Sequence, residues 1–526
     1  MTQDRSSEFA DAAVADIVSD GQAVATVLPP QTGFFGHPRG LATLFFTEMW
    51  ERFSYYGMRA LLILFMTATA AEGGLGFDVA KAGAIYGLYT ALVYLACLPG
   101  GWIADRFLGQ RRSVLWGGIV IALGHFSMAV PSLSTFYVGL GLIVVGTGML
   151  KPNISTMVGQ LYGPEDNRRD AGFTIFYMGI NIGAFIAPLI CGYLGENINW
   201  HYGFAMAGIG MVLGLIQYGL GDRHLGLAGK HPIRATDPIK RQREVMSLRV
   251  GLLSVLGIVA LIMLVAVTGI LPITAEGVSN SFGMILLATV VVFFGWLFFL
   301  GDWTVRERRQ LYVIGVLFLG ASLFWSAFEQ AGTTLNLFAA DRTDRDTAGW
   351  IASLLRLSDG TFPASWFQSL NPLFIISLAP LVAWLWVALG RRNPSSPAKF
   401  AVGLFFVGLG FAVLIVGAIL SAGGVQVSPM WLVVTYLLHT IGELTLSPVG
   451  LSAMTKLAPA RVASLMMGVW FMASAVGNYM GGFLARFYES MALPTLFGTV
   501  ASFTVGAGLI LALLVKPIKR MLERPE

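Results

Sequence analysis

The chain has 526 residues, of which 56% are hydrophobic and only 12% are charged. Soluble domains carry about 25% charged residues, so this composition excludes an ordinary soluble protein and indicates an integral membrane protein. The net charge of +5 does not indicate a nucleic-acid partner, because the Lys and Arg residues gather in alternate loops between apolar runs. Cys97 and Cys191 both lie inside such runs, so they predict no disulfide framework.

Apolar runs along the chain predict fourteen membrane-spanning helices, since one span needs about 20 apolar residues. The first six runs lie near residues 41–70, 83–104, 112–131, 135–160, 171–193 and 201–220. A basic linker and two further runs follow, near 248–271 and 281–301, and the last six lie near 311–340, 366–390, 399–421, 429–456, 462–488 and 493–515. This pattern predicts an all-α membrane protein with two six-helix bundles plus two inserted helices.

The domain boundaries and the topology follow from the same pattern. We predict a disordered cytoplasmic N-terminal tail (1–35), followed by an N-terminal six-helix bundle (36–222). A basic linker with the inserted helix pair (223–310) leads to a C-terminal six-helix bundle (311–516) and a cytoplasmic tail (517–526). An even number of spans places both termini on one side of the membrane. The basic loops all have the same parity, so the positive-inside rule predicts that both termini are cytoplasmic.

The loop between the second and third spans carries a charged motif, Gly101-Trp-Ile-Ala-Asp-Arg-Phe-Leu-Gly-Gln-Arg-Arg. It resembles the cytoplasmic loop signature of the major facilitator superfamily, and two six-helix halves with a substrate site between them are the arrangement of that superfamily. An acid and an arginine at a helix end, followed by basic residues, can form a charge network that holds an inside gate; here they are Asp105, Arg106, Arg111 and Arg112. The alternative is an ordinary positively charged turn.

The first span carries a dense set of charged and tyrosine side chains within three helical turns. At roughly 100° per residue, one stripe of about 60° contains Glu48, Arg52, Tyr55 and Arg59, with Glu51 and Tyr56 on its flanks. A charge inside the bilayer is costly, so ionisable residues there normally face a bundle interior or a wet cavity. The stripe therefore predicts an ion or substrate path.

Four further polar groups lie deep in other spans: Lys151, Asn181, Glu329 and Glu443. A carboxyl that alternates between a basic partner and an apolar surrounding binds and releases a proton, which is the chemistry of a proton-coupled carrier. Each group also has a simpler interpretation. The lysine can extend to the membrane interface, the asparagine can join two helices, and either glutamate can belong to a static ion pair. For His439 we favour a packing role.

Two motifs carry a more specific resemblance. The segments Glu48-x-x-Glu-Arg-Phe-x-Tyr-Tyr-Gly57 and Phe176-Tyr-x-x-Ile-Asn-x-Gly183 resemble the two signature motifs of the proton-dependent oligopeptide transporter family, whose bacterial members commonly carry an inserted helix pair. The resemblance runs from about Gly36 to the end of the last span. It implies a symporter that imports di- and tripeptides together with protons across the bacterial inner membrane.

The resemblance also implies a role for each site residue. Glu48, Glu51 and Arg52 would form the proton-coupling triplet, with Lys151 as its partner. Arg59 and Lys151 would hold the peptide carboxylate, Glu443 with Asn371 and Asn181 would receive the amine and backbone, and Glu329 would pair with Arg59 when the outer gate closes. The cavity and its side-chain pockets would be lined by Tyr55, Tyr56, Tyr94, Trp325, Trp470 and Ser474.

The chain departs from the animal members of that family at one position. Their second-helix histidine corresponds to Gly87, so proton coupling here must rest on carboxylates. We expect no cofactor, metal, nucleic-acid partner or enzymatic activity, and a monomer in the lipid bilayer with protons as the coupling ion. Two alternatives remain: the same fold carrying nitrate or a modified amino acid, and a membrane sensor or enzyme that does not transport.

Overall fold

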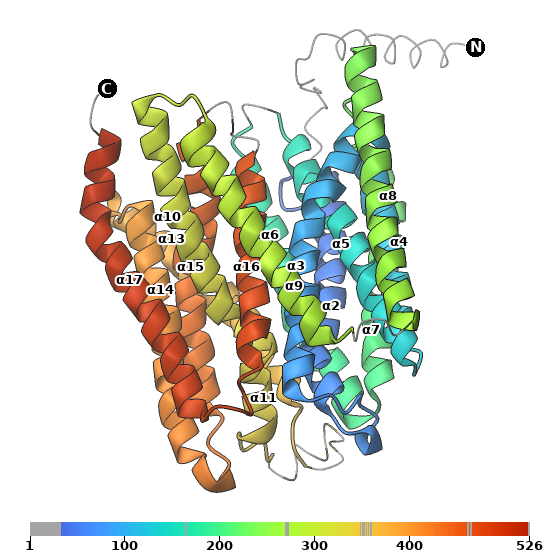
Figure 1. Cartoon of the computed structure of the whole chain (residues 1–526), viewed down its shortest axis with the longest axis vertical. Helices are drawn as coiled ribbons and strands as arrows, with labels where there is room; N and C mark the ends of the chain where they lie inside the picture. The colour runs from blue at the N-terminus through green and yellow to red at the C-terminus, as the bar shows by residue number, and fades with distance from the viewer. Residues whose placement is uncertain are drawn as a thin grey trace.

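The computed structural model describes residues 33–163, 166–268, 273–347, 360–459 and 465–523, with the single positions 349, 353, 355, 357 and 462. Of the predicted N-terminal tail, residues 1–32 lie outside this part. The described chain is almost entirely helical, and its only β-type pairings are isolated bridges. Figure 1 shows the helices standing side by side along one long direction, as expected for a membrane bundle.

The N-terminal half contains the six predicted helices. They are α2 (Arg39–Thr67), α3 (Val79–Ile103), α4 (Gln110–Met128), α5 (Leu133–Gln160), α6 (Arg169–Asn197) and α7 (Trp200–Gly221). Local signals set several of these ends: Asp78 caps α3 by accepting from the backbone N–H of Lys81 at 2.7 Å. Packing among the helices buries part of their apolar surface, and the rest, including Leu123, Val145 and Ile216, stays exposed, as expected for a surface that faces lipid.

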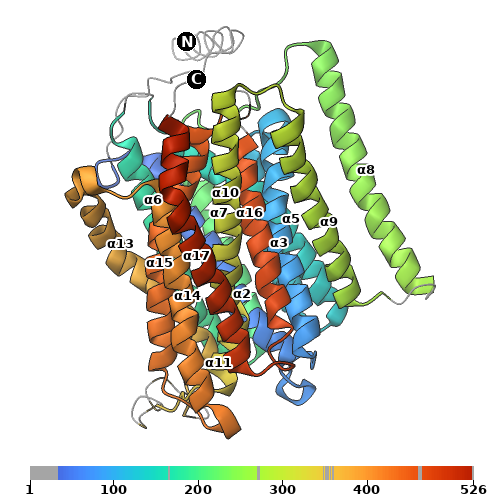
Figure 2. The same cartoon turned by 60° about the vertical axis from the view of Figure 1, so that its left-hand side comes forward.

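The inserted pair consists of α8 (Pro238–Thr268) and α9 (Ala275–Gly295). α9 packs against α3 of the N-terminal half and α16 of the C-terminal half. Two hydrogen bonds from Arg486, to Asn280 and to Ser279, each 2.6 Å long, hold its first turns. α8 is different, since none of the residues in its most apolar window is buried, and it stands apart from the rest of the bundle in Figure 2.

The C-terminal half is built from α10 (Val305–Phe328), α11 (Thr334–Asp341), α13 (Leu370–Ala388), α14 (Ser396–Leu420), α15 (Met430–Leu457), α16 (Met466–Ala485) and α17 (Leu493–Glu523). Two boundaries differ from the predicted ones. α10 begins before residue 311, because Thr304 and Glu307 form a capping box, and α17 continues beyond residue 516.

The span predicted as continuous over 311–340 is broken. α10 ends at Phe328, a tight helical turn occupies Glu329–Gly332, and α11 then begins. The break lets the backbone of Gly332 approach the Tyr86 hydroxyl so closely that a Cβ atom would collide with it. Counted as one interrupted span, α10 and α11 complete six long helices in the described part of this half, and the described residues form fourteen such helices in all.

The two halves meet along a seam between α3 and α16. A Cβ atom on Gly83 would lie 2.8 Å from the carbonyl oxygen of Gly482, and one on Gly87 would lie 2.9 Å from that of Tyr479. Glycine is therefore required where these helices cross, and the histidine of animal relatives has no room at position 87. Below, "the α11 end" is the end of the molecule where α2 finishes and α11 lies, and "the linker end" is the opposite one.

Candidate functional site

A central cavity of about 270 Å³ lies between the two halves. Most of the predicted site residues line it, and they come from both halves. These lining residues are Glu48, Arg52, Tyr56, Arg59, Tyr94, Lys151, Asn181, Trp325, Glu329, Asn371, Glu443, Trp470 and Ser474. The predicted stripe on the first span therefore faces an internal cavity, as expected because charged side chains are costly to expose to lipid.

Glu51 and Tyr55 are not among the lining residues. The Glu51 carboxylate lies behind Arg52 and accepts two hydrogen bonds from its guanidinium, one of them 2.6 Å long from Nη2. Glu48 lies 3.4 Å from the Arg52 Nε atom on the cavity side. The Tyr55 ring is buried, and the Arg52 guanidinium lies 5.1 Å from its centre. The expectation that Tyr55 lines the cavity is thus wrong, because this residue packs under the arginine.

Lys151 reaches the same cavity from α5. Its Nζ atom lies 4.1 Å from the centre of the Tyr94 ring, a cation–π contact. Among the ion pairs of the described residues, none joins Lys151 to Glu48 or Glu51. The lysine is therefore available to a ligand in this conformation, rather than engaged with the triplet.

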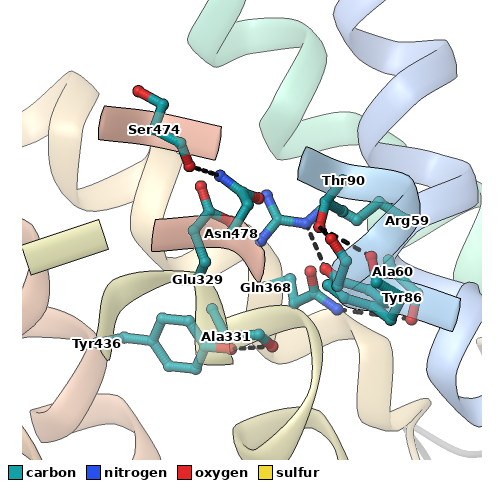
Figure 3. Close-up of polar contacts among 11 residues, drawn as sticks. Arg59, Ala60, Tyr86, Thr90, Glu329, Ala331, Gln368, Tyr436, Ser474 and Asn478 are labelled. Carbon is teal, nitrogen blue, oxygen red and sulfur yellow. Dashed lines mark hydrogen bonds and ion pairs between the residues drawn. The ribbon is translucent and has the colours of Figure 1, made fainter. Parts of the chain in front are cut away.

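Arg59 joins the two halves at the α11 side of the cavity. Its guanidinium forms an ion pair with Glu329, and its Nε atom donates to the Tyr86 hydroxyl at 2.6 Å. Figure 3 shows the arginine extending from one half between Tyr86 and Glu329. The pair is almost fully buried, with 6% and 4% of the two side chains exposed. The pair therefore links the two halves at this side of the cavity.

Glu443 stands on the opposite wall. Its carboxylate accepts from the Asn371 side chain at 2.9 Å, and the same amide donates to Thr440 at 3.0 Å. Within the described residues no cation lies within 4.0 Å of this carboxylate. A buried carboxylate without a cationic partner favours a ligand that brings one.

The remaining lining residues make local contacts. Asn181 donates to the backbone carbonyl of Tyr177 at 2.9 Å, and Ser474 donates to that of Trp470 at 3.2 Å. Both hydrogen bonds stay within one helix, so neither of them joins the two halves. His439, in contrast, is buried against Phe411, with 5.0 Å between the ring centres, in agreement with the packing role favoured for it.

Sequence reasoning missed several cavity residues. Tyr177, Gln368 and Tyr436 line the cavity, and Tyr86 supports Arg59. Tyr177 belongs to the second signature motif, so this motif could have identified it as a cavity residue. The others are single polar side chains in apolar runs, and their partners come from distant segments; Gln368, for example, donates to the backbone of Ala60 at 3.5 Å.

The charged loop motif docks the linker onto the N-terminal half. Arg111 donates to the carbonyl of Ala228 at 2.7 Å and pairs with Asp222 at 3.2 Å. Arg106 lies 3.6 Å from Glu244 of α8, and the Asp105 carboxylate accepts from Gln110 at 3.1 Å. Arg112 is exposed. Arg106 and Arg111 thus contact α8 and the segment that follows α7, whereas the partner of Asp105 lies within the motif itself.

Two six-helix halves around a buried cavity lined by charges from both define a multi-pass membrane transporter of the major facilitator type. The sequence model of the POT family matches residues 111–499. The chain belongs to this family.

Individual relatives resemble the chain along nearly its whole length. The "Peptide transporter YePEPT" of Yersinia enterocolitica is 42% identical and covers 95% of this chain and 98% of its own. The "Di-/tripeptide transporter" of Lactococcus lactis subsp. cremoris is 40% identical, and the match covers 93% of this chain and 97% of the relative. A crystal structure of the peptide transporter POT in complex with sulfate superposes with a TM-score of 0.86 at 43% identity, and the match covers 94% of this chain and 98% of that structure's chain.

Proposed function

We propose that this protein is a proton-coupled symporter that imports di- and tripeptides across the bacterial inner membrane by alternating access. One observation carries the proposal: the cavity has cationic groups on one wall, Arg52, Arg59 and Lys151, and the carboxylate of Glu443 on the other. A zwitterionic peptide has the complementary arrangement, with a carboxylate at one end and an ammonium group at the other. The relatives described as a peptide transporter and a di-/tripeptide transporter support the same substrate class.

The topology assigns a direction to the cavity. Because the basic linker and the charged loop motif lie at the linker end, the positive-inside rule favours a cytoplasmic position for this end and for both termini. The α11 end then faces outward, and the Arg59–Glu329 pair closes it. In this assignment the conformation described above is closed to the outside, and peptide leaves toward the linker end.

Carboxylates carry the coupling proton in this proposal. Protonation of Glu329 would remove the charge that holds Arg59, and protonation of Glu48 or Glu51 would loosen Arg52. Peptide and proton together would then neutralise the cavity, and the halves can move with fewer unpaired buried charges. Lys151 would re-form pairs with the triplet after the peptide leaves. The proposal needs no cofactor and no enzymatic step, and a monomer in the bilayer is sufficient.

The test is uptake of labelled dialanine into liposomes that contain the purified protein, with an inward proton gradient. We expect accumulation that disappears when an uncoupler collapses the gradient and that unlabelled di- and tripeptides compete away. Lack of dialanine uptake under a verified gradient would reject the peptide assignment. Competition by nitrate or by modified amino acids would then identify the alternative solute.

A further inference from the structure

Glu196 makes a contact between the halves that the transport proposal does not use. It is near the C-terminal end of α6, and its carboxylate accepts from the backbone N–H of Ala364 at 2.7 Å and of Ser365 at 3.0 Å. These two N–H groups are the first of the short helix η6 (Ala364–Ser369), which leads directly into α13. A side chain of the N-terminal half therefore caps a helix of the C-terminal half. We call this contact the cross-half cap.

The sequence of η6 leaves this helix without a cap of its own. The first N–H groups of a helix have no partner within it, and a Ser, Thr, Asp or Asn at the N-cap position usually satisfies one of them. Here the N-cap residue is Pro363, which makes no side-chain cap. A carboxylate satisfies the two groups and also interacts favourably with the positive end of the helix.

Neighbouring hydrogen bonds also join α6 and η6. The Trp366 indole donates to the carbonyl of Leu189 at 3.1 Å, and the Ser369 hydroxyl donates to that of Phe185 at 2.8 Å. Arg345 holds the preceding segment by donating to the carbonyl of Phe362 at 2.7 Å. All these groups lie at or toward the α11 end, but Glu196 does not line the central cavity. The cross-half cap is thus separate from the peptide site.

We propose that Glu196 is a positioning residue for the outer gate, where the cross-half cap acts as a second closure beside the Arg59–Glu329 pair. The inference rests on the proposed alternating access. When the α11 end opens, α6 and η6 separate and water must replace both hydrogen bonds. The cap therefore stabilises the outward-closed conformation without touching substrate, and its loss raises the population that is open to the outside.

The chain offers a matched control. Glu72 is also a glutamate at the α11 end, but its carboxylate accepts from the Thr69 N–H at 3.0 Å and so caps a turn within its own half. Spin labels on Val130→Cys and Val425→Cys, which are exposed on loops of the two halves at this end, report their separation. The two native cysteines are fully buried and do not compete for label. The full chain in lipid nanodiscs is used, without peptide.

Loss of an N-cap shifts an equilibrium roughly fivefold, so Glu196→Ala should raise the ratio of long to short label distances by about that factor. Glu196→Gln, which keeps one uncharged acceptor oxygen, should give a smaller rise. If Glu196→Ala and Glu72→Ala give the same distances, the inference is wrong. If Glu196→Ala fails to fold, Glu196→Gln is compared with Glu72→Gln, and equal distances overturn the inference. Because no peptide is present, failure of the peptide assignment leaves this readout intact.

Discussion

Glu443 is the residue whose charge the proposed peptide site depends on most directly. The residue is 9% exposed, and its carboxylate accepts a hydrogen bond from the uncharged amide of Asn371 at 2.9 Å. A hydrogen bond to a charged group contributes about 1.5–3 kcal/mol. Glu443→Gln is close in size and keeps an acceptor oxygen, so it removes mainly the charge. We expect it to weaken binding of dialanine roughly tenfold to a hundredfold.

The assay is competition against a labelled dipeptide bound to the purified protein, performed with dialanine and with N-acetyl-dialanine, which has no ammonium group. In the wild type the acetylated peptide should bind more weakly by about the same factor as the Glu443→Gln variant binds dialanine. In the variant, acetylation should reduce the affinity only slightly further, because the carboxylate that binds the ammonium group is already absent. If acetylation reduces affinity equally in both proteins, Glu443 does not receive the amine.

Three other changes test separate parts of the structure. Glu51→Gln should abolish proton-driven uptake of dialanine but leave counterflow exchange, because it removes the charge that pairs with the neighbouring arginine; full proton-driven uptake would reject the coupling role. Gly87→Ala should lower the thermal denaturation midpoint, since its Cβ would lie 2.9 Å from a carbonyl oxygen of α16 and overpacking costs about 1–3 kcal/mol. Gly141→Ala is the control, with open space at its Cβ, and an equal midpoint in both would contradict the packing argument. Ser54→Ala should destabilise the fold by about 1–3 kcal/mol, because it leaves the buried His125 ring without its 2.6 Å hydrogen bond; an unchanged denaturation curve would refute this.

The sequence was sufficient for the number and order of the helices, since each span needs a long apolar run and such runs are visible without a structure. The stripe on the first span was also visible, because helical periodicity alone places its charges on one side. Periodicity does not say which side chains reach the cavity: Tyr55 of the stripe and Glu51 on its flank pack against Arg52, whereas Tyr56 on the other flank lines the cavity.

Other features depend on contacts between distant segments, which a single sequence does not display. The break at Glu329–Gly332 brings Gly332 close to Tyr86, and these two residues lie on different halves. The cap that Glu196 provides depends on a helix far along the chain, since Ala364 lies 168 residues after it. In the sequence, nothing distinguishes Glu196 from any other acidic residue at the end of a span.

The isolation of α8 has a practical consequence for experiments on this protein. No residue in its most apolar window is buried, and the helix stands away from the rest of the bundle in Figure 2. Since transport requires the halves to move against each other, rigid attachments to either half disturb that movement. A fused domain or an affinity tag placed next to α8 adds mass and a point of immobilisation while leaving the moving parts of the protein free.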